Sequence, residues 1–264
     1  MAFKLTWMPT TLLDAGLKVA EVDGWPNRGR AEMGEVLGVM LHHTAGPRSG
    51  NMPSLRTLID GRPDLSGPLS QLGLGRDGTF YVIAAGRANH AGAGEWQGVS
   101  AGNSSFIGIE CENTGKSDDS PWPEVQLDAL ARGVAVLLKK LGRDVIWCVG
   151  HKEYALPKGR KPDPDFDMDA FRERVKRLMD PATPPAVLIP AVEPKPPAGV
   201  VPRPTLRRGD RGEAVRALQT LLGIAPADGS FGPITEAKLR AWQAGKHLVP
   251  DGIVGPKTWA MLSR

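Results

Sequence analysis

The chain has 264 residues, of which 41% are hydrophobic and 23% charged, a balance typical of a folded globular protein and not of a disordered one. No apolar stretch approaches the roughly 20 residues of a membrane-spanning helix, so the sequence predicts no membrane insertion. The net charge of +4 lies entirely in residues 205–264, where nine Lys/Arg outnumber five Asp/Glu, and this basic part suits an acidic or polymeric partner. The N-terminal residues lack the basic and apolar segments of a secretory signal, which predicts synthesis in the cytoplasm without a signal peptide.

The first 180 residues alternate strand and helix patterns. Short apolar runs with β-branched residues predict four strands, at 38–43 (GVMLHH), 78–86 (GTFYVIAAG), 106–113 (FIGIECEN) and 145–151 (VIWCVGH). Apolar residues spaced by three and four predict one helix over 124–142, ended by Gly142, and another over 167–180. The fold class that follows is α/β, a mixed central sheet flanked by helices. Cys111 and Cys148 lie inside two of these strands and are predicted to be buried free thiols.

Residues 181–204 contain nine prolines among 24 positions, which predicts a semi-rigid linker without a helix or a central strand. This linker separates a domain over 1–180 from a small module over 205–264. The module repeats an Asp-Gly turn followed by Gly-Pro, as DGSFGPIT at 228–235 and DGIVGPKT at 251–258. Because proline is favoured in the first turn of a helix, the repeat and the apolar spacing around it predict three short helices.

Histidines stand at the ends of two predicted strands, His42 and His43 after the first and His151 after the last. Open α/β sheets gather ligands at the carboxyl ends of their strands, so these imidazoles are candidates for a shared metal. A catalytic zinc has three protein ligands and one open position. The third ligand would come from the loop GRKPDPDFD, at Asp163, Asp165 or Asp167. Successive strand side chains point to opposite faces, so only one of the adjacent histidines faces the site, and the pattern alone does not decide which.

Four segments, in this order, resemble the zinc-dependent type 2 N-acetylmuramoyl-L-alanine amidases, relatives of the peptidoglycan recognition proteins: VMLHHTAG, FIGIECEN, VGHKE and GRKPDPDFD. The resemblance covers most of residues 35–180. The segment 72–92 (LGLGRDGTFYVIAAGRANHAG) is further similar to lysins of phages that infect actinobacteria. Residues 205–264 resemble the three-helix peptidoglycan-binding module, whose members repeat the D-G-x-x-G-P-x-T turn.

The resemblance implies the zinc ligands. His42, His151 and Asp163 match the three positions of the family, and His43 becomes the neighbour that faces the other way. Residues implied to contact the substrate are His90, in the segment NHAG, together with Thr44 and Asn113.

The resemblance also implies the catalytic pair, Glu110 and Lys161. Glu110 would accept the proton of water and deliver it to the leaving amine, and Lys161 would stabilise the oxyanion. Glu112, two residues further along the same strand, is the competing base, and Lys161 could instead be one surface charge of the basic run KGRK. Many relatives place a tyrosine or histidine shortly before RDG, where this chain has Ser70 and Gln71. Neither is a good proton acceptor, which places more of the catalysis on Glu110.

The sequence therefore predicts a zinc enzyme that hydrolyses the amide between N-acetylmuramic acid and L-alanine of peptidoglycan. We expect a phage endolysin, a monomer made in the host cytoplasm that acts at the cell wall after release. The alternative is a non-catalytic peptidoglycan-binding or sensing protein, a class that typically lacks part of the ligand set. Nucleic acid is not an expected partner, because the basic module shows no Arg/Lys stripe interleaved with aromatic residues.

Overall fold

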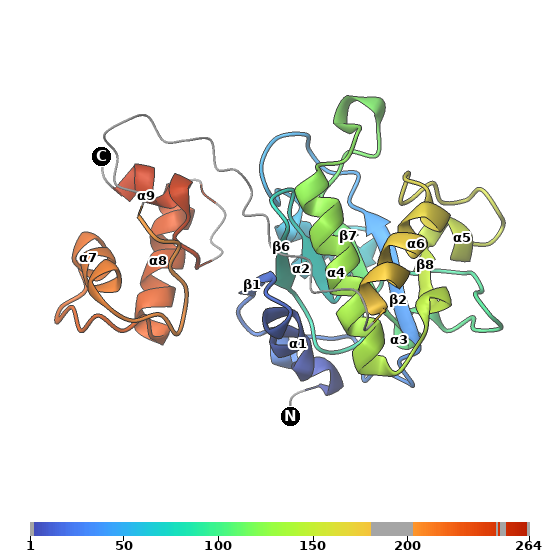
Figure 1. Cartoon of the computed structure of the whole chain (residues 1–264), viewed down its shortest axis with the longest axis horizontal. Coiled ribbons are helices and arrows are strands. Elements are labelled where there is room, and N and C mark those ends of the chain that lie inside the picture. The colour runs from blue at the N-terminus through green and yellow to red at the C-terminus, as the bar shows by residue number, and fades with distance from the viewer. Residues whose placement is uncertain (1–2, 181–202, 247, 249–251, 263–264) are drawn as a thin grey trace. The chain divides into compact units, whose positions relative to one another are not determined.

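The computed structural model describes residues 3–180, 203–246, 248 and 252–262, and the chain forms two compact units, Met1–Val187 and Leu188–Arg264 (Figure 1). Each unit has its own hydrophobic core. The linker predicted over 181–204 lies outside the described residues, except for its last two positions. Among the helices in the described ranges, none combines the length and the apolar character needed to cross a bilayer.

The N-terminal unit contains a six-stranded sheet with the order β1-β6-β5-β7-β2-β8. Its strands are β1 (Lys18–Glu21), β2 (Gly38–His43), β5 (Leu72–Leu74), β6 (Thr79–Val82), β7 (Phe106–Cys111) and β8 (Cys148–Gly150). The β5–β6 pair is antiparallel and the other pairs are parallel, which confirms the predicted mixed sheet. The last strand is shorter than predicted, because 145–147 form a 3-10 turn in which the Asp144 carboxylate accepts a hydrogen bond from the Ile146 N–H.

Three helices pack on one face of the sheet: α1 (Met8–Asp14), α4 (Glu124–Leu141) and α6 (Met168–Met179). In Figure 1, α4 crosses in front of the strands. It ends as predicted at Gly142, whose φ of 66° is a left-handed conformation that glycine adopts without a Cβ clash. The apolar stripe of α4 shares a core with alternate residues of β2 and β7, namely Val39, Leu41, Ile107 and Ile109.

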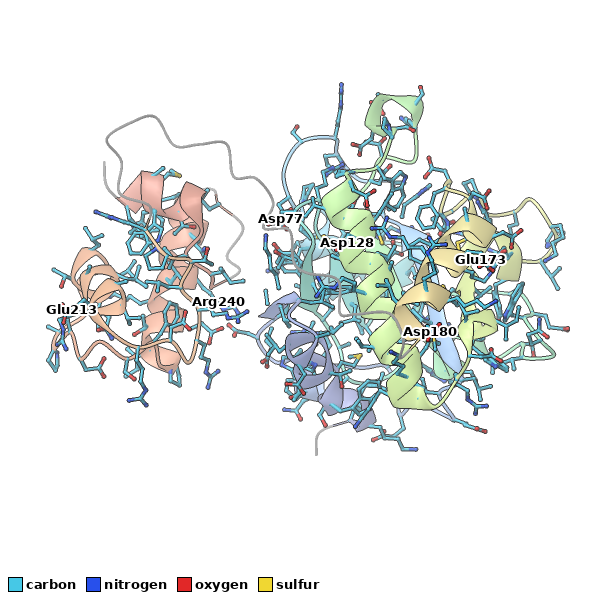
Figure 2. All side chains as sticks on the ribbon, in the orientation of Figure 1. Asp77, Asp128, Glu173, Asp180, Glu213 and Arg240 are labelled. Atoms are coloured by element: carbon cyan, nitrogen blue, oxygen red, sulfur yellow. The ribbon has the colours of Figure 1, made fainter. Side chains whose placement is uncertain are left out.

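Ion pairs join α4 and α6 at their solvent side. The Arg174 guanidinium of α6 lies 2.7 Å from a Glu124 carboxylate oxygen and 2.9 Å from one of Asp128, both on α4. Figure 2 labels Asp128 on this helix. Exposed pairs of this kind contribute little to stability, so the apolar core holds the helices on the sheet.

The other face of the sheet is covered by short elements. These are α2 (Leu55–Asp60), which leads into the hairpin of β3 (Gly61–Arg62) and β4 (Leu65–Ser66), α3 (Gly102–Ser105) and α5 (His151–Tyr154). Side chains that alternate with the main core form a small apolar cluster here: Met40, Ala91, Phe106, Val149 and Tyr154. In the described part of the unit, 3-10 turns lie at Lys4–Trp7, Trp25–Asn27, Ser117–Asp119 and Val145–Trp147.

The C-terminal unit contains the three predicted helices, α7 (Glu213–Leu221), α8 (Pro233–Gly245) and α9 (Pro256–Leu262). Helices α8 and α9 both begin at the proline of a repeated turn. Each turn is held by a buried glutamine of the preceding helix. Gln219 accepts a hydrogen bond from the Gly229 N–H at 2.8 Å, and Gln243 accepts one from the Gly252 N–H at 2.9 Å. The repeat in the sequence is therefore also a repeat in the structure.

Candidate metal centre

Three neighbouring parallel strands, β7, β2 and β8, end at the same edge of the sheet. His42 of β2 is paired with Glu110 of β7, so both side chains leave the sheet on the same face. His151 follows the last residue of β8 and begins α5, and Asp163 comes from the loop between α5 and α6. The parallel topology thus gathers four polar side chains from distant parts of the chain.

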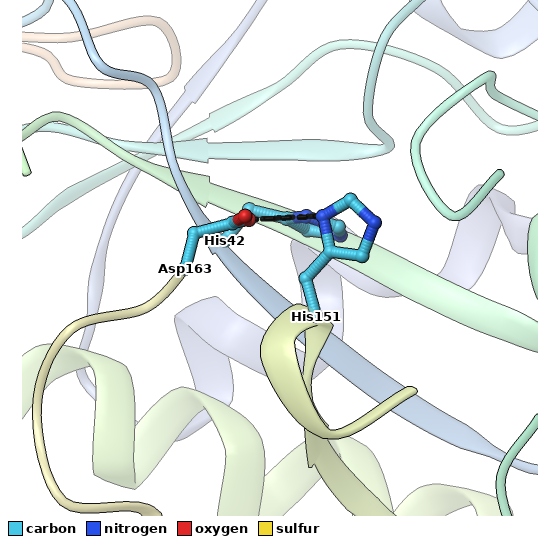
Figure 3. A group of neighbouring side chains, drawn as sticks. All are labelled: His42, His151 and Asp163. Carbon is cyan, nitrogen blue, oxygen red and sulfur yellow. Dashed lines mark hydrogen bonds and ion pairs between the residues drawn. The ribbon is translucent and has the colours of Figure 1, made fainter. Parts of the chain in front are cut away.

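The side chains of His42, His151 and Asp163 converge on one point (Figure 3). The two imidazole Nδ1 atoms are 3.0 Å apart, and Asp163 Oδ2 lies 3.1 Å from that of His42 and 3.0 Å from that of His151. Ligand atoms that surround a tetrahedral zinc at about 2.0–2.1 Å are about 3.3 Å from one another. The three atoms therefore approximate one face of a zinc tetrahedron and leave its fourth corner open.

Hydrogen bonds alone cannot satisfy all three contacts among the two Nδ1 atoms and the Asp163 oxygen. A carboxylate oxygen only accepts, so both contacts to Asp163 are hydrogen bonds only if both Nδ1 atoms carry protons. Two N–H groups would then point at each other across 3.0 Å. If either proton is absent, one buried contact has no hydrogen. A cation at the centre removes the conflict, because all three atoms then direct lone pairs at it.

The outer nitrogens of the two rings have partners that suit this arrangement. His151 Nε2 lies 2.9 Å from the carbonyl oxygen of Ala91. A carbonyl only accepts, so this nitrogen carries a proton, and Nδ1 is the ring nitrogen that faces the site. His42 Nε2 lies 3.0 Å from Nδ1 of His90, which can accept its proton in the same way. Sequence reasoning missed the Ala91 contact, because a backbone carbonyl leaves no signal in the residue type.

The electrostatics of the site also favour metal binding. Burial lowers the pKa of His42 to about 4, with the hydrogen bond to Asp163 opposing the shift, so the ring is neutral near pH 7. Burial likewise lowers the pKa of His90 well below its ordinary value, and the neighbouring His42 adds to the effect. Burial raises the pKa of Asp163, but the hydrogen bonds from His151 and His42 outweigh it, and the net pKa is lowered. Neutral imidazoles and an ionised carboxylate are the protonation states that ligands need.

The loop that carries Asp163 is fastened to α5. The backbone N–H of Lys152 donates to the Asp163 carbonyl at 2.6 Å, directly beside His151. At the start of the helix, Glu153 accepts a hydrogen bond from the Gly150 N–H at 2.8 Å. Arg172 of α6 in turn donates to both oxygens of Glu153, at 2.9 and 2.7 Å. Two ligands are therefore held by the same small network.

The structure decides between the adjacent histidines. His42 joins the cluster, whereas His43 points to the opposite face of the sheet, where its Nδ1 lies 3.6 Å from an Asp165 oxygen. Its ring also lies so close to Gly115 that a Cβ there would come within 2.4 Å of it. Strand alternation predicts this division, and Asp163 supplies the carboxylate of the cluster while Asp165 lies beside His43.

The two candidate bases have different surroundings. Glu112 is fully buried and accepts three hydrogen bonds at 2.8–2.9 Å, from the Thr44 hydroxyl and from the hydroxyl and N–H of Ser54. Glu110 has a buried oxygen, Oε2, without a hydrogen-bond partner in the described part of the chain. Burial and the charge of Asp163 raise the pKa of Glu110 to about 8. Glu112 is engaged in structure, and Glu110 is available for proton transfer.

Lys161 precedes Asp163 by two residues and influences the centre. Its charge lowers the pKa of both His42 and Glu110, as a nearby cation does. Within the residues that the structure describes, its ammonium group has no ion-pair partner. The side chain is half-buried, so it combines proximity to the site with an unneutralised charge.

A pH dependence follows for the metal-free protein. Folded Glu110 binds its proton more tightly than in the unfolded chain, where the pKa has its ordinary value of 4.5, so folding takes up a proton between pH 4.5 and about 8. The free energy of unfolding falls as pH rises through this window. Glu110→Gln should remove this loss and be more stable than wild type by up to about 5 kcal/mol at pH 9, with little gain at pH 4. Denaturant unfolding of both proteins in excess chelator measures the difference, and a gain that does not change with pH would contradict it.

The three residues that the resemblance implies in substrate contact make contacts with other groups of the protein. Asn113 is fully buried, donates to the Asp119 carbonyl at 3.1 Å and accepts from the Gly115 N–H at 2.8 Å, so it shapes its own loop. The Thr44 hydroxyl is used by Glu112. His90 is buried against His42, as a partner of a ligand ring. The side chains of Asn113 and Thr44 therefore hydrogen-bond within the protein, and contact of these three residues with substrate stays a prediction.

The positions before RDG are buried as well. The side-chain amide of Gln71 donates to the Gly86 carbonyl at 3.2 Å, and its oxygen accepts from the Gly108 N–H at 2.7 Å. Ser70 is fully buried, and its hydroxyl has no partner among the described residues. The Gln71 side chain thus joins the segment of Gly86 to β7.

Two family models match the chain. Residues 32–166 match the model described as N-acetylmuramoyl-L-alanine amidase, and residues 208–262 match a peptidoglycan binding domain. The first match lies inside the N-terminal unit and the second inside the C-terminal unit.

Individual relatives match either a short segment of the chain or most of it at low sequence identity. An uncharacterized protein of Kitasatospora aureofaciens is 48% identical over 65 residues, 22% of this chain and 55% of its own length. The zinc D-Ala-D-Ala carboxypeptidase of Streptomyces albus G is 42% identical over 62 residues, 21% of this chain and 24% of its own length. The chain therefore spans about half of the first relative and about a quarter of the second. The solved amidase AmiD of E. coli is 20% identical, with 92% of this chain and 95% of that chain covered and a TM-score of 0.44.

Proposed function

The chain belongs to the N-acetylmuramoyl-L-alanine amidase family, and from this premise we propose that it hydrolyses the amide between N-acetylmuramic acid and L-alanine in bacterial peptidoglycan, with zinc as its cofactor. The observation that carries the proposal is the convergence of His42, His151 and Asp163 on one point, on the sheet face that also presents Glu110. Such an enzyme acts at the cell wall.

The donor set fits zinc. Two imidazole nitrogens and one carboxylate oxygen are ligands that catalytic zinc takes, and their mutual distances of 3.0–3.1 Å are close to the spacing of about 3.3 Å in a tetrahedral site. When bound, zinc supplies a Lewis acid that polarises the scissile carbonyl and lowers the pKa of a water molecule. The remaining chemistry belongs to side chains around the site.

Glu110 is the proposed general base and acid. Its Oε2 has no hydrogen-bond partner among the described residues, so it is available to take the proton of the attacking water and to return it to the leaving nitrogen. A pKa of about 8 lies near neutral working pH, where one group can serve in both directions. Glu112 cannot replace it without breaking its three hydrogen bonds.

Lys161 is the proposed stabiliser of the oxyanion. Hydrolysis places negative charge on the former carbonyl oxygen, and a fixed cation in a partly buried site lowers the energy of that state. The ammonium group has no competing carboxylate within 4.0 Å in the described residues. Lys161 stands two residues before Asp163, and its charge acts on both His42 and Glu110.

The direct test of the reaction uses purified peptidoglycan and the full chain. The protein is stripped with a chelator and assayed with and without added Zn²⁺ for new L-alanine amino termini. Hydrolysis of this amide predicts that they appear only with the metal. Wall binding without release of amino termini, under both conditions, would instead support the non-catalytic binding protein.

The C-terminal unit is proposed to bind the polymer. Its basic surface, three-helix structure and match to a peptidoglycan binding domain support this role. A second binding module raises the effective concentration of the catalytic unit on an insoluble substrate. The division into 1–180, a linker over 181–204 and 205–264 remains part of this proposal.

Truncation tests the division of labour. Residues 1–180 should retain the turnover of the full chain on a soluble muramoyl-peptide, because the metal centre lies entirely in the N-terminal unit. Binding to insoluble wall should weaken by a factor of roughly 10²–10⁴, the gain that a linked second site can provide. Co-sedimentation with wall and the soluble assay measure the two effects. Equal loss in both assays would contradict separate roles.

A further inference from the structure

We propose that Asn103 is a positioning residue of the metal centre, because its side-chain oxygen holds the segment that contacts both ligand imidazoles. The proposal rests on the metal site of the proposed function. Residues 90 and 91 supply both ring partners: His90 Nδ1 lies 3.0 Å from His42 Nε2, and the Ala91 carbonyl lies 2.9 Å from His151 Nε2. The orientation of two ligands therefore depends on where one dipeptide lies.

A single atom fixes that dipeptide. Asn103 Oδ1 accepts hydrogen bonds from the backbone N–H groups of both His90 and Ala91, each at 2.8 Å. A carbonyl oxygen has two lone pairs, so both are used here. The amide nitrogen of Asn103 has no hydrogen-bond partner in the described ranges, so the oxygen alone carries the role.

Asn103 is itself anchored to the elements of the site. It lies in α3, which leads directly into β7, the strand of Glu110. The first residue of α3, Gly102, donates its N–H to the Tyr154 hydroxyl at 3.0 Å, and Tyr154 belongs to the helix that begins with His151. The same hydroxyl donates to the Ser100 carbonyl at 2.6 Å. Asn103 thus couples a ligand helix and a catalytic strand to the partners of the ligand rings.

The His90 ring lies so close to strand β7 that the dipeptide of residues 90 and 91 has little room to move toward this strand. A Cβ on Gly108 of β7 would come within 2.8 Å of the His90 ring, so the ring lies almost directly on the backbone of that strand. The ring also contacts His42, with 5.1 Å between the ring centroids. Without Asn103 the dipeptide can move away from the strand, and both ligand rings lose their outer partners.

Three variants separate this role from a general effect on folding. Asn103→Leu removes the acceptor at similar volume, and Asn103→Asp keeps an oxygen that accepts both N–H groups. Asn89→Ala is the matched control: it removes a neighbouring asparagine whose side chain donates to the Ser66 carbonyl at 2.9 Å and not to residues 90 and 91. Asn103→Ala serves if the leucine variant does not fold.

The readouts are zinc affinity, by competition with a chelator in the absence of substrate, and the unfolding midpoint of the metal-free proteins. Loss of an outer partner costs about 10–100-fold in metal affinity, so Asn103→Leu or Asn103→Ala should bind zinc about 10–100-fold more weakly. The aspartate variant and the Asn89 control should bind like wild type. Wild-type affinity in a folded leucine or alanine variant would overturn the inference, as would an equal loss in Asn103→Asp. Failure of the wild-type protein to bind zinc would overturn the proposed function, and the inference with it.

Discussion

Replacing His42 with alanine is expected to lower zinc affinity by more than the roughly 10–100-fold that loss of an outer partner costs, and to abolish most amidase activity. His42 supplies one of three donor atoms, and two ligands hold a cation far less well than three. The change also leaves the His90 ring buried without its 3.0 Å contact. Bound metal per chain after dialysis and release of L-alanine amino termini measure the two losses.

His43→Ala is the matched control for this prediction. It removes the same side chain from the next residue of the same strand, but on the opposite face of the sheet, 3.6 Å from Asp165. Zinc content and activity of the folded variant should stay close to those of the wild-type protein. If both alanine variants lost zinc to the same degree, the assignment of one imidazole to the metal would be wrong.

Glu110→Gln is expected to reduce turnover by about 10²–10⁴-fold while zinc binding persists, because the amide cannot take up a proton in the way the carboxylate can. The change is nearly isosteric, and Glu110 is not one of the three converging side chains. The measurements are turnover at saturating soluble substrate and metal content of the same sample. Substantial turnover with metal bound would place the base elsewhere.

Glu112→Gln should show the opposite pattern. An amide group turned toward Ser54 meets an N–H and cannot replace all three hydrogen bonds, so the free energy of unfolding should fall by about 1–3 kcal/mol. Turnover of the folded fraction should persist. The pair of variants therefore distinguishes a carboxylate that transfers protons from one that fastens the segment of Thr44 and Ser54 to the end of β7.

Local patterns in the sequence determined much of the fold. Short apolar runs with β-branched residues predicted β2 and β7, three- and four-residue spacing predicted α4 with its stop at Gly142, and the repeated proline predicted the starts of α8 and α9. Short elements such as α3 and β5 escaped prediction, because three or four residues carry too little periodicity to stand out. The resemblance to the amidases added the order of the ligands, which no local pattern contains.

The tertiary structure decided which of two nearby residues of the same type belongs to the site. Alternation required His42 and His43 to point in opposite directions, but which faces the metal depends on the side of the sheet that α4 covers, a helix more than 80 positions away. The same holds for Glu110 and Glu112, since the second is occupied only because Ser54 and Thr44 reach it from another segment. Local spacing determines relative orientation within an element, whereas burial and partners arise from contacts between distant segments, which a single sequence does not display.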